Sequence, residues 1–367
     1  MKKFLSLILI TAAIFSLVSC GGSKYEPVES SELESQTAFT ISVDGKTYEV
    51  KYELYRFLFL SNKKDVDGGD NSVWSGANKD KYIAEIDEII IEKAAEIYSV
   101  LHLANKVGID LYSSEYDKMI AEAIADTVSS EEEGGFSGDY QKYLDYLKEI
   151  NLNYSVADLL LRYSVAEDAL YEYYTGTLDG EYVSEAQMGA LKYTKEDVEA
   201  FYYNDAESVR VRRIYRQKDY VSRDRIYEIR EALVEAAASS ESAALDYLMN
   251  QRGPTTSASD MENGDLHGRH SEDKLYYEEM INTAFELEIG EVSDVIEVSS
   301  TDDEAYVIMY RIPKNNEHFL DCYDYIASIY VHNEIGKLLD SCSEALTASA
   351  EKGAMLVGLD RGTISMD

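Results

Sequence analysis

The sequence predicts an α+β protein in which a helical lobe is followed by a β-α-α-α-β-β segment and a C-terminal helix. Three observations lead to this fold class. Apolar residues recur at helical spacing from Asp80 to Val107, as expected of an amphipathic helix. Residues 209–215 and 305–312 are instead rich in β-branched and aromatic residues, which favour strands. The chain has 367 residues, enough for about two domains.

The first part of the chain is expected to form a hairpin and several helices. Residues 39–43 alternate apolar and polar side chains, and Asp44-Gly45 suits a tight turn before a second strand. Gly108 is placed to end the long helix, and Ser113 or Ser114 can cap the next one. Further helices are expected from the apolar spacing at residues 52–60, 139–149 and 155–174. The first half is therefore almost entirely helical.

The second part is expected to alternate between strands and helices. Thr194 and Asp197 have the spacing of a capping box, which begins a short helix. A loop rich in Gly, Ser, Thr and Asn is expected from Gly253 to Gly268, and Pro313 is expected to end the last strand. The helices are expected at residues 224–238, 240–249, 276–287 and 318–352, and the strands at 209–215, 295–298 and 305–312.

The N-terminus has the pattern of a bacterial lipoprotein signal peptide. Lys2 and Lys3 precede an apolar run that is too short to span a bilayer, and Leu17-Val18-Ser19-Cys20 resembles a lipobox. The resemblance implies cleavage before Cys20 and a diacylglyceryl group on its sulfur, and two acyl chains anchor a protein stably. An ordinary signal peptide is the alternative. We expect an extracytoplasmic protein that is anchored to the bacterial membrane through this lipid.

The chain is strongly acidic. It has 34 Lys and Arg against 70 Asp and Glu, for a net charge of −36. Nucleic acid is excluded as a partner, because phosphate binding depends on Lys and Arg. The acidity either attracts basic segments of a partner or only maintains solubility.

The cysteines and histidines do not predict a metal or redox centre. Cys322 and Cys342 follow Cys20 without a CxxC spacing, and we expect two free thiols, with a disulfide as the alternative. Asp265, His267 and His270 lie in the expected loop, where little would fix the geometry of ligands. We expect no metal site and no cofactor.

The middle of the chain resembles a parvulin-type (PpiC-like) peptidyl-prolyl isomerase domain. Five pieces in the order of that family carry the resemblance: Val209–Ile214, Asn263–Leu266, Thr283–Leu287, Gly290–Ser293 and Tyr306–Met309. With the lipobox and the flanking helices, the whole chain looks like a foldase lipoprotein of the SurA/PrsA type. The resemblance implies a signal peptide at 1–19, a flexible tether at 20–37, a helical chaperone lobe at 38–206, a parvulin-like domain at 207–314 and a helical segment at 315–367 that packs on the lobe.

Prolyl isomerisation needs neither a nucleophile nor a metal. Its barrier is the ~18–20 kcal/mol needed to twist an amide out of conjugation, and an apolar pocket with well-placed polar groups can lower it. The family's pocket for the proline ring falls near Tyr276, Met280 and Phe285 here. The alternative is that Met280 and Phe285 are only core residues of this domain.

The polar positions of the family differ in this chain. Its two strand histidines fall at Arg213 and Val307, and its loop Cys or Asp falls near Ser257, with Asp260 close by. The candidate catalytic residues are therefore Arg213, Ser257 and Asp260. Since arginine only donates hydrogen bonds and stays charged, it cannot replace a neutral histidine, so both catalysis and simple peptide binding stay open.

The predicted function is a foldase or chaperone that binds unfolded, extended secreted polypeptides, with isomerase activity either retained or lost. A peptide-binding or scaffold lipoprotein of the cell envelope without catalytic activity is the alternative. A solute-binding lipoprotein would need two α/β lobes with repeated βαβ units, which the helical first part of the chain lacks.

Overall fold

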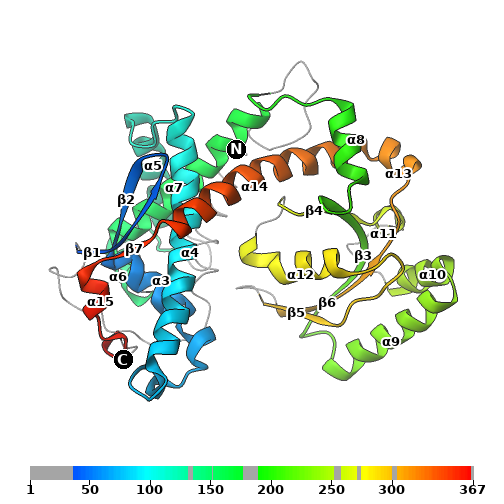
Figure 1. Ribbon diagram of the computed structural model, residues 1–367, viewed down its shortest axis with the longest axis horizontal. Coiled ribbons are helices and arrows are strands. Elements are labelled where there is room, and N and C mark those ends of the chain that lie inside the picture. The colour runs from blue at the N-terminus through cyan, green and yellow to red at the C-terminus, as the bar shows by residue number, and fades with distance from the viewer. Residues whose placement is uncertain are drawn as a thin grey trace. The chain divides into compact units, whose positions relative to one another are not determined.

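A computed structural model describes residues 36–130, 135–150, 152–176, 189–251, 258–270, 274–299 and 304–364. It is a mixture of helices and small antiparallel sheets, so the predicted α+β class is confirmed (Figure 1). The chain divides into two compact units. We call Met1–Leu170 with Leu339–Asp367 the outer unit, and Tyr171–Leu338 the central unit.

The outer unit begins with the predicted hairpin. Strands β1 (Thr37–Val43) and β2 (Lys46–Lys51) pair in antiparallel fashion around Asp44-Gly45, where both residues have positive φ angles. The helices are α3 (Tyr52–Asp67), α4 (Lys79–Lys106), α5 (Ser114–Ser129), α6 (Tyr140–Glu149) and α7 (Tyr154–Thr175), with a 3₁₀ turn, η1 (Asn71–Trp74), after α3. The long helix α4 therefore forms where the apolar spacing predicts it.

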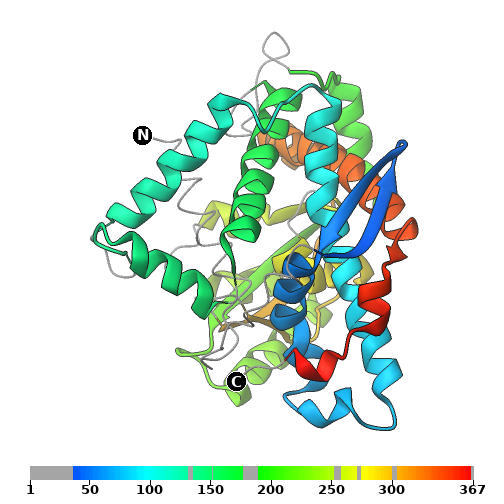
Figure 2. The ribbon, with the colours of Figure 1, turned by 90° about the vertical axis from the view of Figure 1, so that its left-hand side faces the viewer.

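The C-terminal segment joins the hairpin in one sheet. After α14 (Tyr323–Ala348), the short strand β7 (Glu351–Lys352) pairs antiparallel with β1, which gives the strand order β2-β1-β7. Figure 2 shows the C-terminal segment, in red, beside the hairpin, in blue. The amide of Gly353 donates to the carbonyl of Ala38 at 2.8 Å. The short helix α15 (Ala354–Gly358) and the 3₁₀ turn η3 (Arg361–Thr363) complete the segment. Residues far apart in sequence thus build one core.

The central unit begins with α8 (Lys195–Tyr203), which has the predicted capping box between Thr194 and Asp197. The elements that follow are β3 (Ser208–Gln217), α9 (Arg223–Ser239), α10 (Glu241–Gln251), α11 (Ala258–Asn263), β4 (Asp265–Gly268), α12 (Lys274–Glu286), β5 (Ile296–Ser299), β6 (Glu304–Arg311) and α13 (Asn316–Asp321). The first part of α14 ends this unit.

The sheet of the central unit has the order β4-β3-β6-β5, with every pair antiparallel. Alternation along the strands gives it two faces. One face carries Ile214 and Ile308 and packs on α9, α10 and α11. The other carries Val211 and Met309 and packs on α12. Figure 1 shows α12 on one side of the sheet, with α9 and α10 on the other.

The expected loop at 253–268 is wrong in its second half, because this stretch contains α11 and β4. The order of elements is therefore β-α-α-α-β-α-β-β. The strand β4 exists because it pairs with Ser208–Val211 of β3. Gly264 makes the turn between α11 and β4 with a φ of 67° and lies so close to the Val211 carbonyl that a Cβ atom would clash.

The expected continuous helix from 318 to 352 is also wrong. It is broken at Cys322, whose φ of −113° and ψ of 20° end α13, and α14 starts at the next residue. The helix stops at Ala348, because residues 351–352 pair with β1 instead. The second departure comes from a partner distant in sequence, the strand β1.

Candidate functional site

The face of the central sheet that packs on α12 brings together three of the predicted site residues: Arg213, Met280 and Phe285. Val211, Val307 and Met309 form its apolar floor, and all three are 0% exposed. Arg213 lies on the same face, since it is two residues beyond Val211 on β3 and pairs in register with Met309. The site therefore combines an apolar floor with a cation at its edge.

Arg213 is held by an ion pair. Its Nε atom lies 2.9 Å from an Oδ atom of Asp265, the residue that starts β4 and pairs in register with Val211. Both side chains are more than a third exposed, so the pair contributes little to stability. Arg213 can donate to a peptide carbonyl, but a permanently charged guanidinium cannot accept a proton from a reacting group.

Met280 and Phe285 are both carried by α12, and their surroundings differ. Met280 is 2% exposed and belongs to the core cluster of this face. Phe285 is half-buried, and the guanidinium carbon of Arg269 lies 4.0 Å from the centre of its ring. Arg269 is fixed in turn, because its Nε atom donates to the Ala206 carbonyl at 2.8 Å. One face of the Phe285 ring is thus covered by a cation.

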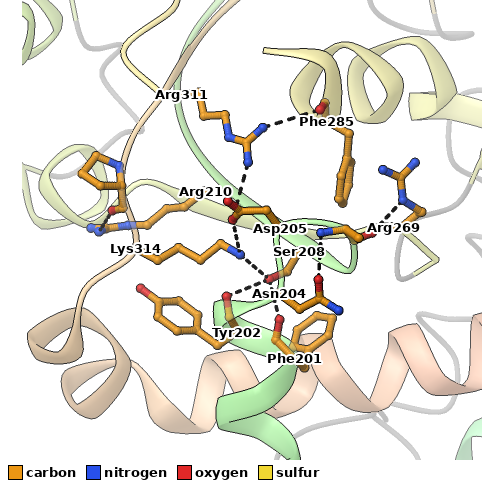
Figure 3. Close-up of polar contacts among 12 residues, drawn as sticks. Phe201, Tyr202, Asn204, Asp205, Ser208, Arg210, Arg269, Phe285, Arg311 and Lys314 are labelled. Carbon is orange, nitrogen blue, oxygen red and sulfur yellow. Dashed lines mark hydrogen bonds and ion pairs between the residues drawn. The ribbon is translucent and has the colours of Figure 1, made fainter. Parts of the chain in front are cut away.

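A cluster of polar side chains, which we call the polar junction, lies where the chain enters β3 and where it leaves β6 (Figure 3). The ammonium group of Lys314 lies 2.9 Å from a carboxylate oxygen of Asp205 and donates to the hydroxyl of Ser208 at 3.2 Å. Ser208 in turn donates to the backbone carbonyls of Phe201 and Tyr202 in α8. Burial lowers the pKa of Lys314, and Asp205 opposes that shift.

Arg311 connects the junction to α12. It donates to the Leu287 carbonyl at 2.5 Å, just past the end of the helix that carries Phe285, and lies 3.5 Å from Asp205. A cation at the C-terminal end of a helix satisfies carbonyls that have no partner within the helix. The junction therefore positions α12 on the sheet; its groups are engaged with one another, which favours a structural role.

Two arginines of β3 hold the turn before β4 from the other face of the sheet. Arg210 donates to the carbonyls of Asn263 at 2.5 Å and Pro313 at 3.1 Å, and Arg212 donates to those of Met261 and Glu262 at 2.9 Å. Burial lowers the pKa of both guanidinium groups. These bonds explain why arginines alternate along a buried strand.

The remaining predicted residues stay predictions. Cys20 and Ser257 lie outside the described residues, Asp260 lies in α11, and Tyr276 lies in α12. Cys322 and Cys342 are free thiols, and burial raises the pKa of Cys342 to about 11. Within the described ranges, no group of three or more His, Cys, Asp or Glu side chains is arranged to hold a metal ion.

Comparison with known proteins gives matches among solved structures. No protein-family model and no curated protein matches the chain. The foldase protein PrsA of Streptococcus pneumoniae matches with 15% identity over 85% of this chain and 93% of that one, at a TM-score of 0.27. PrsA of Bacillus subtilis matches with 14% identity over 86% of this chain and 93% of that one, at a TM-score of 0.24. PrsA of Lactococcus lactis matches with 13% identity over 90% of this chain and 100% of that one, also at a TM-score of 0.24. The chain is thus similar to solved foldases of the PrsA type, as its sequence predicts.

The structure places two histidines where the sequence did not predict them. His267 is buried in β4, on the same face as Arg213, because it pairs in register with Val209. His318 is 4% exposed in α13 and bonds through Nδ1 to the hydroxyl of Tyr202 at 2.9 Å. The alternation of side chains along β4 places His267 on this face, and it could have been predicted only if β4 had been expected to be a strand. Nothing local marks His318.

Proposed function

We propose that this chain is an extracytoplasmic, lipid-anchored foldase that holds extended segments of unfolded secreted polypeptides. The observation that carries the proposal is the sheet order β4-β3-β6-β5, with three helices on one face and α12 on the other. The pieces that resemble a parvulin domain belong to this one sheet and its helices. Val209–Ile214 lies in β3, Asn263–Leu266 spans the turn into β4, Thr283–Leu287 ends α12, and Tyr306–Met309 lies in β6.

The proposed contact surface for a client lies where α12 meets the sheet. Phe285 and Tyr276 would receive a proline ring or another apolar side chain, with the buried Met280 as part of the apolar support beneath it. Arg213 would donate to a backbone carbonyl of an extended segment. Extended chains expose their carbonyls, and arginine donates to them without needing a particular sequence. The domain limits 38–206, 207–314 and 315–367 are part of this proposal.

Holding a client is the activity that these residues favour over catalysis. Lowering a barrier of ~18–20 kcal/mol requires groups that stabilise the twisted amide. The residues at the two histidine positions are Arg213, which is paired with Asp265, and Val307, which is 0% exposed. A module that binds peptides without isomerising them is therefore the second candidate, and the same experiment separates the two.

The proposed lipid anchor depends on Cys20. Among the described residues, no helix combines the length and the apolar character that crossing a bilayer requires. If the lipid is present, cells that express the chain will retain it in the membrane fraction, and the Cys20→Ala variant will be released. Mass spectrometry of the first peptide of the processed chain tests the same point directly. Release of both proteins to the same extent would refute the anchor.

The proposed function is tested by the suppression of aggregation of an unfolded secreted protein, with isomerisation of a proline tetrapeptide measured in parallel. We expect suppression with weak or no isomerisation. Met280→Ala should weaken the binding of proline peptides. Leu248→Ala is the matched control, because Leu248 is equally buried but lies in the cluster on the opposite face of the sheet. Absence of both activities in the unmodified chain would refute the foldase proposal.

A further inference from the structure

A pocket of about 550 Å³ lies within the central unit, next to the predicted site but separate from its apolar floor. It is bounded by the turn between α11 and β4, by the end of α13 and by the start of α14. Its lining includes Gly264, Asp265, His318, Asp321, Cys322 and Asp324. Its volume is in the range of ordinary ligand sites.

His318 places a buried hydrogen-bond acceptor at this pocket. The hydroxyl of Tyr202 accepts from the Asn315 amide at 3.1 Å and lies 3.3 Å from the Asn315 carbonyl and 2.9 Å from Nδ1 of His318. A phenol has one proton, so all three bonds form together only if it donates to the carbonyl and Nδ1–H of His318 donates to it. Nε2 is then an acceptor, and it has no hydrogen-bond partner among the described residues.

The charge at the pocket also favours a donor-rich cation. Asp321 and Asp324 are exposed, and no ion pair joins either of them to a cation within the described ranges. Asp265 is paired with Arg213. Burial and the charge of Arg210 lower the pKa of His318 to about 4, so its Nε2 atom stays an acceptor near neutral pH. Buried acceptors and exposed carboxylates complement a group that only donates.

We propose that this pocket binds the guanidinium group of an arginine in an extended polypeptide. A guanidinium carries five donors in a planar fork and accepts none, so its donors match the acceptors of this lining, which include Nε2 of His318 and the carboxylates of Asp321 and Asp324. The inference deepens the proposed function, on which it rests, by naming a class of client segment. It also gives the carboxylates of Asp321 and Asp324 a specific use.

The test uses the purified full chain and a fluorescent glycine-serine peptide that contains two arginines. The same peptide with citrulline is the comparison, because citrulline keeps the shape of arginine and loses its charge. We expect the arginine peptide to bind more tightly, and the double variant Asp321→Asn/Asp324→Asn to weaken it by about three- to tenfold. Asp219→Asn/Asp246→Asn removes two exposed charges elsewhere in the central unit and should leave binding unchanged.

A second readout locates the bound peptide. Cys322 lines the pocket and is partly exposed, so a saturating arginine peptide should slow its alkylation, measured by mass spectrometry. Equal binding of the arginine and citrulline peptides, equal effects of the two double variants, or unchanged alkylation of Cys322 would each overturn the inference. If the chain still prevents aggregation in that case, the proposed function stands. If it does not prevent aggregation, the proposed function fails independently of the peptide result.

Discussion

The contact between Arg361 and Asp87 is expected to decide whether the C-terminal segment stays joined to the outer unit. Nη2 of Arg361 lies 3.0 and 2.7 Å from the two carboxylate oxygens of Asp87. The Arg361 side chain is 4% exposed and that of Asp87 is 2% exposed. Tyr55 donates to the same carboxylate at 2.7 Å, and Lys352 of β7 lies 2.8 Å from it. This network therefore connects α4 to two parts of the C-terminal segment.

We predict that Arg361→Met lowers the free energy of unfolding of the outer unit by about 2–4 kcal/mol. Breaking a buried ion pair typically costs ~3–5 kcal/mol, because the remaining charge is left without its partner. The expected loss is smaller here, since Lys352 and Tyr55 still bind Asp87. The variant also removes the donors to the carbonyls of Leu356 and Leu359. The lost free energy of unfolding should therefore be well above the loss from breaking an ion pair on the surface.

The assay is urea unfolding followed by circular dichroism, with hydrogen exchange of the Gly353 amide as a local probe. That amide donates to Ala38, so its protection should fall together with the stability. The control is Lys118→Met, which breaks an exposed pair with Glu122 in the same unit and should cost under about 1 kcal/mol. A loss for Arg361→Met no larger than that of the control, with Gly353 still protected, would show that this reasoning is wrong.

Three further predictions concern the central unit. His318 has a folded-state pKa of about 4, below its ordinary value of 6.5, so the unfolded state takes up the proton first as the pH falls. The contribution of His318 to the free energy of unfolding should be complete above about pH 6.5 and should fall by about 3 kcal/mol towards pH 4, and His318→Gln should flatten that dependence in urea titrations at several pH values. Met280→Ala should destabilise the unit by about 2–5 kcal/mol in thermal and urea unfolding, whereas Met280→Leu should cost under about 1.5 kcal/mol; equal losses would argue against close packing at this position. Arg210→Met should cost about 2–3 kcal/mol, because three backbone carbonyls lose a donor, and the exposed Arg225→Met should cost much less in the same assay.

Local patterns were sufficient to predict most of the long elements. The helix α4, the hairpin of β1 and β2, the capping box at Thr194 and the strands β3 and β6 all form where the sequence indicates them. Their apolar spacing, turn residues and β-branched residues lie within the elements themselves. An element of this kind is specified by its own residues, so tertiary contacts need only agree with it.

The short strand β4 shows why other elements could not be predicted. Asp265-Leu266-His267-Gly268 contains residues that disfavour strands, and it is a strand because β3 lies beside it. The two-residue strand β7 likewise depends on its pairing with β1 and not on its own residues. Such elements have too few residues to be stable alone.

The sequence by itself determined the fold class, the long helices and strands, and the two faces of each strand through alternation. It did not determine which neighbour covers each face. Only the tertiary structure decided that Arg210 and Arg212 are buried against α11 while Arg213, the next residue along, lies at the edge of the candidate site. It also placed His318 beside Asp321 and Asp324 at a pocket. The physical reason is that propensity and alternation act over a few residues, whereas burial and charge pairing depend on segments that only folding brings together.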